Sequence, residues 1–195
     1  FINKMQILYL RGEYDKAYDF MQLSEDYLDD SPGMLHTSEH YFYSGMILCQ
    51  LNGTQPKWKK RIKSYRKKFK KYASTCPSTF EPKYYLLEGE ISRAFNQKRR
   101  AEDYYYKAIE SAIQYNYRNI SALAHLLLAR LHRTQGKNLL TQFHLKEAQD
   151  NYSALGATGL AGGLAVNYSD LFEDERQRMD VLSGMPSSHS SVNQL

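Results

Sequence analysis

Residues 118–136 read RNISALAHLLLARLHRTQG, a strongly apolar helical segment that ends at a glycine. Three other places in the chain show the same arrangement, in which a helical segment ends at a small or polar residue and a second helical segment follows. The four breaking residues lie 41, 43 and 40 positions apart; they are Gly12, Gly53, Asn96 and Gly136. A fixed period of this length is typical of stacked helical hairpins, each of which buries its apolar face only against its neighbours.

Apolar residues at helical spacing predict helices through most of the chain. Turn residues such as those at 29–33 and the Asn52–Gly53 pair separate these helices. The pattern therefore predicts an all-α superhelix of about four hairpins, the first of them incomplete, with a short closing helix. The predicted helices cover residues 1–11, 13–29, 35–51, 55–74, 79–95, 98–116, 118–135, 138–155 and 157–168.

The second helix of three hairpins carries small, large and small residues at positions 5, 9 and 12 after the breaker. In the third hairpin these residues are Ala101, Tyr105 and Ala108. The first hairpin has Ala17, Met21 and Ser24, and the fourth has Thr141, Leu145 and Ala148, whereas the second departs from the rule with Trp58, Ile62 and Tyr65. Such spacing lets neighbouring helices approach closely around one bulky side chain. It resembles the tetratricopeptide (TPR) pattern with its period lengthened from 34 to about 40 residues, and predicts a TPR-like α-solenoid.

We expect residues 1–172 to form the TPR-like helical-repeat domain and residues 173–195 to form a polar linker or tail. The serine-rich ending SGMPSSHSSVNQL has little apolar surface to bury, which predicts disorder. The chain starts at Phe1 inside an amphipathic pattern and is interpreted as part of a longer polypeptide. No apolar run approaches the ~20 residues that span a bilayer, and no signal peptide is visible. Two cysteines without metal-ligand spacing fit a reducing compartment, so we expect a cytoplasmic location.

The charge of the chain is concentrated in one segment. The formal net charge is +5, yet residues 57–71 contain ten Lys or Arg and no acid, so the remaining 16 basic and 21 acidic residues sum to −5. We consider three roles for this basic segment: a solvated face, a surface that docks onto acidic protein, or a contact for nucleic acid or anionic lipid. Its aromatic residues share one stripe that must pack inward, which disfavours base stacking and hence a nucleic-acid partner. The candidate interaction residues are Lys57, Lys59, Lys60, Arg61, Lys63, Arg66, Lys67, Lys68, Lys70 and Lys71.

No pattern in the sequence indicates a catalytic, cofactor or metal site. His36 and His40 have helical spacing for two metal ligands, but the order HTSEH is not HExxH, and we interpret them as polar residues near a helix start. His125 and His132 are interpreted as residues of a helix seam. The glycines in the GATGLAGGLA stretch that begins at Gly156 lack the GK pair and the preceding strand of a phosphate loop. We therefore expect this segment not to be an enzyme.

From about residue 39 to residue 172 the sequence resembles the helical-repeat segment of large multidomain signalling kinases. The resemblance is carried by HYFYSGMILCQL, KKFKKYASTCPSTFEPKYYLLEGEISRAFNQ, AEDYYYKAIESAIQYNY, ALAHLLLARLHRTQGK and FHLKEAQDNYSALGATGLAGGL. Family members usually end with a charged helix, whereas here the last helix, GATGLAGGLAVNY, is uncharged and rich in glycine.

The resemblance implies a parent polypeptide with a serine/threonine-kinase-like domain, a STAND-type AAA ATPase module, this repeat, a GAF domain and a sensor histidine kinase. ATP and Mg²⁺ would then bind outside these 195 residues. The repeat would be a non-catalytic scaffold that relays or restrains signals between the ATPase and the histidine kinase. Its expected partners are domains of the same polypeptide or a peptide in the concave groove. Two alternatives remain open: a stand-alone TPR-like binding module, and the repeat region of an ATPase-type transcriptional regulator.

Overall fold

The structure, a computed structural model, describes residues 1–25, 28, 35–51 and 53–171. All regular secondary structure in these ranges is helical, which confirms the all-α prediction. The predicted tail, residues 173–195, lies outside the described residues. Within the described ranges the helices are α1 (Ile2–Leu10), α2 (Tyr14–Glu25), α3 (Leu35–Gln50), α4 (Pro56–Thr75), α5 (Pro77–Ala94), α6 (Lys98–Gln114), α7 (Arg118–Arg133), α8 (Asn138–Ala154) and α9 (Thr158–Asn167).

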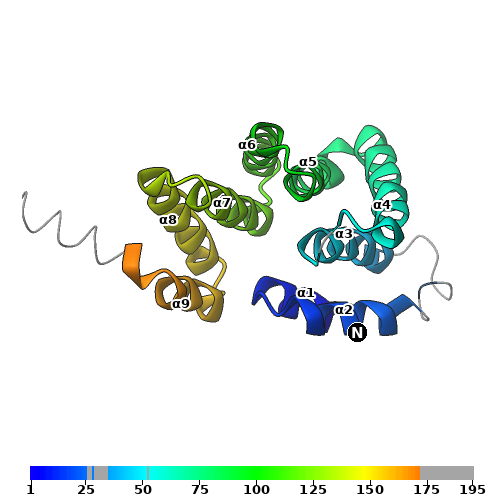
Figure 1. The fold of residues 1–195 in the computed structure, drawn as a ribbon, viewed down its shortest axis with the longest axis horizontal. Coiled ribbons are helices and arrows are strands. Elements are labelled where there is room, and N and C mark those ends of the chain that lie inside the picture. The colour runs from blue at the N-terminus through cyan, green and yellow to red at the C-terminus, as the bar shows by residue number, and fades with distance from the viewer. Residues whose placement is uncertain (26–27, 29–34, 52, 172–195) are drawn as a thin grey trace, which may run out of the picture.

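The helices pack in serial order, as a solenoid does. The four hairpins are α1–α2, α3–α4, α5–α6 and α7–α8, and α9 packs on α8. The first helix of each hairpin also contacts the first helix of the next hairpin, from α1 to α3, from α3 to α5 and from α5 to α7. Figure 1 shows that the hairpins follow a curved path, so that α9 returns to the side of the molecule where α1 lies. The TPR-like solenoid prediction is therefore confirmed.

The turns between the later helices repeat one backbone geometry at an interval of twenty residues. Two or three residues after the end of each helix, one residue has a positive φ, with values of 58° at Asn96, 60° at Asn116, 69° at Gly136 and 71° at Gly156. The next N–H reaches back to a carbonyl five residues earlier, as from Gln97 to Ser92 at 2.9 Å. This hydrogen bond satisfies a carbonyl that would otherwise be unpaired at the helix end. Glycine and asparagine tolerate this left-handed conformation best, which is why they break the pattern.

Gly53 has a different role from the other predicted breakers. Gly12 and Gly136 have positive φ. A Cβ atom added at Gly53 would lie 3.1 Å from Ile62 Cδ1 and 3.4 Å from Ala94 Cβ. A glycine at position 53 thus lets neighbouring elements approach closely.

The apolar character of α7 follows from its place between two hydrophobic clusters. Leu123 and Leu127 belong to a core that runs from α1 to α7, whereas Leu126 and Ala129 belong to a second core with α8 and α9. A helix covered on both sides has to be apolar around most of its circumference. The repeat positions predicted to be packed also lie inside: Ala17, Ala101, Tyr105, Ala108, Leu145 and Ala148 have no exposed surface.

The curvature brings the first and last parts of the chain into contact. Arg130 of α7 donates hydrogen bonds to the hydroxyl of Tyr14 in α2 (2.7 Å) and to that of Tyr168, just after α9 (3.3 Å). On the inner side, Gln6 of α1 donates to the Tyr43 hydroxyl of α3 at 2.9 Å. The bonds of Arg130 thus join the fourth hairpin to the first hairpin and to the residue that follows the closing helix.

Candidate interaction surface

The sequence of α4 produces a helix with one apolar stripe and a cationic remainder. Pro56 occupies the first turn, where its missing N–H costs nothing. Apolar residues then follow at intervals of four, three and four, and all four are buried: Trp58, Ile62, Tyr65 and Phe69. Because lysine and arginine fill the other positions, docking this stripe against α3 and α5 leaves the cations on the outer surface.

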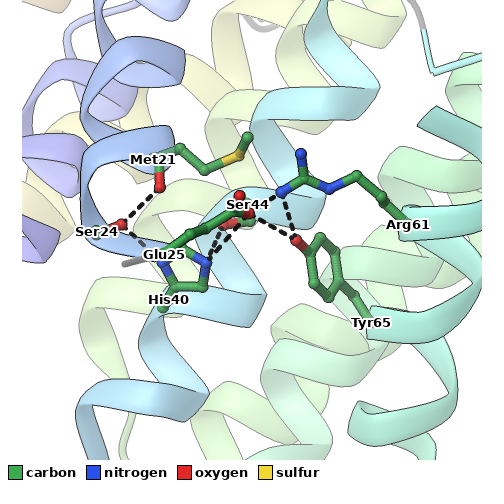
Figure 2. Close-up of polar contacts among 7 residues, drawn as sticks. All are labelled: Met21, Ser24, Glu25, His40, Ser44, Arg61 and Tyr65. Carbon is green, nitrogen blue, oxygen red and sulfur yellow. Dashed lines mark hydrogen bonds and ion pairs between the residues drawn. The ribbon is translucent and has the colours of Figure 1, made fainter. Parts of the chain in front are cut away.

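Two of the ten predicted interaction residues are used inside the fold. Arg61 pairs with Glu25 of α2 and lies 3.0 Å from the Tyr65 hydroxyl (Figure 2). Arg66 makes two hydrogen bonds to Glu88 of α5, one of them 2.9 Å long from Nη2 to Oε2. Glu88 has only 1% of its surface exposed, so it requires this counter-charge. These arginines attach α4 to its neighbours.

Three lysines of α4 lie over aromatic rings. The Nζ atom of Lys68 is 3.5 Å from the ring centroid of Tyr41, that of Lys57 is 4.1 Å from Trp58, and that of Lys59 is 5.6 Å from Phe95. Such cation–π contacts contribute about 0.5–1 kcal/mol at exposed sites. They leave the charge uncompensated, and they hold two exposed lysines, Lys57 and Lys59, close to the scaffold.

The outer side of α4 is a continuous cationic surface. We call seven exposed lysines the basic face: Lys57, Lys59, Lys60, Lys63, Lys67, Lys70 and Lys71. Within the ranges that the structure describes, no carboxylate lies within ion-pair distance of any of them. Lys68 is half-buried beside this surface. The basic face therefore presents many long, mobile cations, and the nearby aromatic rings of Trp58, Tyr65 and Phe69 are buried below it.

Beside α4, the buried ring of His40 is held between two serine hydroxyls. The His40 ring in α3 has its Nδ1 2.9 Å from the Ser24 hydroxyl and its Nε2 3.2 Å from the Ser44 hydroxyl (Figure 2). Burial, together with the charge of Lys68, lowers the pKa of His40 to about 4. The neutral ring thus joins α2 to α3 beside the Arg61–Glu25 pair. The interpretation of His40 as a simple polar residue near a helix start missed this role, whereas His36 is exposed.

The sequence did not predict a second histidine cluster, between α7 and α8. Nδ1 of His125 lies 3.0 Å from Nδ1 of His144, and the ring of His132 stacks on His144 with centroids 5.4 Å apart. One of the two facing nitrogens must carry a proton and the other must accept it. His125 and His132 do lie in the seam between α7 and α8. Their partner, His144, directly precedes the repeat position Leu145 and was not identified from the sequence. Across the described ranges, no group of three His, Cys, Asp or Glu side chains is arranged to hold a metal ion.

Comparison with known proteins gives one match. The family model described as CHK1-like, TPR repeats matches residues 1–174, which is most of the chain. Searches of curated proteins and of solved structures gave no match. In the part of the chain that the structure describes, every helix is too short or too polar to cross a membrane.

Proposed function

The chain belongs to the family of CHK1-like, TPR repeats, and we propose that it is a non-catalytic helical scaffold that docks an acidic protein partner on the basic face of α4. TPR-like repeats provide a helical scaffold for protein–protein interaction. The observation that carries the proposal is the basic face itself. Seven exposed lysines lack a carboxylate partner within the described residues, on a protein whose residues outside 57–71 sum to a net charge of −5.

The chemistry of the basic face favours protein over nucleic acid. Binding to single-stranded nucleic acid commonly uses aromatic rings on which bases stack. The aromatic residues of α4 that point into the core, Trp58, Tyr65 and Phe69, have at most 8% of their surface exposed. A surface of lysines alone attracts an acidic segment through long-range charge, and this attraction weakens as salt is added.

The location of the basic face also distinguishes it from the inner side of the curve. A peptide in the concave groove would have to displace contacts such as the bond between Arg130 and Tyr14. The basic face requires no such rearrangement. We therefore place the protein partner on α4, and a domain of the same polypeptide is the partner that we favour.

We further propose that the scaffold acts within a longer cytoplasmic signalling protein, where it relays or restrains between an ATPase module and a sensor histidine kinase. The resemblance of residues 39–172 to the helical-repeat segment of multidomain signalling kinases supports this assignment. Two free cysteines fit a reducing compartment. ATP and Mg²⁺ would bind to those other modules. Sequencing beyond residue 195 tests the assignment. A GAF domain and histidine kinase support it, a helix-turn-helix favours the transcriptional regulator, and a stop codon favours the stand-alone module.

The docking proposal is tested by calorimetry with a synthetic glutamate-rich peptide and its glutamine counterpart. The quadruple variant Lys60→Gln, Lys63→Gln, Lys67→Gln and Lys70→Gln should weaken binding of the acidic peptide about tenfold or more. A matched control changes four exposed cations of α6: Lys98→Gln, Arg99→Gln, Arg100→Gln and Lys107→Gln. Both variants lower the formal net charge from +5 to +1 (5 − 4). A difference in their affinity for the peptide therefore reports a local binding site on α4 and not the overall charge. Equal losses in both variants, or tighter binding of single-stranded DNA than of the peptide, would contradict the proposal.

A further inference from the structure

A cleft of about 690 Å³ lies where the two ends of the solenoid meet. Its walls come from α1, from α7, and from α9 with the turn that precedes it. Six of the lining side chains are apolar: Ile7, Leu10, Leu126, Ala157, Leu160 and Leu164. Ile7 is 52% exposed, although it faces a space that a ligand could fill. The volume lies within the range of about 300–1,000 Å³ that small-molecule sites occupy.

Arg130 gives this apolar cleft a positive charge. It lines the cleft and is partly buried, and its hydrogen bonds go to two neutral phenols, Tyr14 and Tyr168. In the described ranges, no carboxylate lies within ion-pair distance of it. The other cation at the cleft, Arg11, is already paired with Glu13 at 3.0 Å. Because removing a charge from water is costly unless it is paired, Arg130 lacks the counter-charge expected at such a position.

Two glycines of α9 keep the cleft open. Gly159 and Gly163 line it, and a Cβ atom added at either one would meet nothing within 4 Å. In α3 and α5 the helical glycines are explained by crowding, since a Cβ at Gly89 would lie 2.6 Å from the Tyr105 ring, whereas at Gly162 of α9, which does not line the cleft, a Cβ would also meet nothing within 4 Å. Glycine inside a helix costs about 0.5–1 kcal/mol relative to alanine. No neighbouring group in the described structure accounts for that cost at Gly159 or Gly163.

We propose that this cleft binds a small monocarboxylate with an apolar body. The carboxylate supplies the counter-charge to Arg130, since guanidinium and carboxylate groups match in geometry and charge. The apolar body lies against Ile7 and Leu10 of α1 on one side and Leu160 and Leu164 on the other. A bound ligand joins the first hairpin to the closing helix, and so controls the curvature of the scaffold. This site is separate from the basic face of α4.

The probe is decanoate, used below its micelle concentration, with the neutral 1-decanol as its partner of equal chain length. Calorimetry should give a one-to-one complex for decanoate, with affinity at least about tenfold higher than for decanol. Arg130→Gln should remove this preference for the anion. The α4 quadruple lysine variant should bind decanoate like the parent protein.

A matched pair of glycine variants decides the location of the site even if Arg130→Gln does not fold. Gly163→Leu places a side chain in the cleft and should weaken decanoate binding at least about tenfold. Gly162→Leu removes a neighbouring helical glycine that does not line the cleft, and it should retain the parental affinity. No binding of decanoate at millimolar concentration, equal affinity for decanol, or unchanged affinity in Gly163→Leu would overturn the proposal.

Discussion

Tyr105 of α6 donates a hydrogen bond to Glu90 of α5 at a point where neither residue has any exposed surface. Glu90 also accepts hydrogen bonds from Gln50 of α3 (2.7 Å) and from Arg93 (2.9 Å to each oxygen). One buried carboxylate thus joins helices α3, α5 and α6. Because the charge is paired and its lone pairs are used, the network can be buried without a large penalty.

Replacing Tyr105 with Phe should destabilise the fold by about 1–2 kcal/mol, because Glu90 loses one donor and cannot recover it from water. The ring and its packing remain in place. The measurement is the urea midpoint followed by circular dichroism. Tyr106→Phe is the control, since Tyr106 is 38% exposed and its hydroxyl makes only a 3.4 Å contact with His144. Equal midpoints for the two variants would refute the role of the Tyr105 bond.

Replacing Gly89 with Ala should destabilise the fold by about 1–3 kcal/mol, since the new methyl group would lie 2.6 Å from two atoms of the Tyr105 ring. Gly159→Ala tests the same chemical change where space is open, and there the gain in helix propensity should raise stability by up to about 1 kcal/mol. Opposite signs in thermal melts are the expected result. Stabilisation by Gly89→Ala would show that α5 and α6 are not packed as closely as described.

Replacing Arg66 with Gln should cost about 1–2 kcal/mol, because it leaves the buried Glu88 carboxylate without its cation. This loss is small for the removal of one partner of a buried ion pair, because Arg66 is itself 44% exposed and screened by water. The neighbouring Lys67→Gln removes an equal charge from the basic face and should change stability by no more than about 0.5 kcal/mol. Chemical denaturation of the two single variants separates a structural cation from a surface one.

The stability of the protein should fall as the pH drops from about 6.5 towards 4. Burial lowers the pKa of His125 from 6.5 to about 4, and burial together with its two histidine neighbours does the same for His144. Above pH 6.5 these rings are neutral in both folded and unfolded chains. Below it, the unfolded chain takes up protons that the folded state excludes, so each ring removes up to about 1.4 kcal/mol per pH unit in this window.

Urea titrations between pH 7.5 and 5 measure this loss before most carboxylates are protonated. His125→Asn combined with His144→Asn should reduce the pH dependence and leave the share that comes from buried His40, although it lowers stability at neutral pH. His36→Gln is the control, because His36 is exposed and should leave the profile as it is. A parent protein whose stability is constant across this range would contradict the burial of the histidine cluster as neutral rings.

The sequence by itself determined the helices, their order and the inward face of each. Apolar spacing located all nine described helices to within a few residues, because a helix that stacks in series must repeat its buried face at every turn. The breakers Gly12, Asn96 and Gly136 marked the turns because glycine and asparagine tolerate a positive φ. The apolar circumference of α7 also reflects its position between two cores.

Only the tertiary structure decided what the charged and polar residues do. Ten cations of α4 look alike in sequence, yet Arg61 and Arg66 meet buried or partly buried carboxylates on other helices, whereas the basic face does not. Glu90 and Arg130 were missed because their partners lie on other helices: Gln50 of α3 and Tyr105 of α6 for Glu90, and Tyr14 of α2 for Arg130. Helical periodicity fixes the direction of a side chain on its own helix, but the superhelical curvature fixes which distant residue it meets.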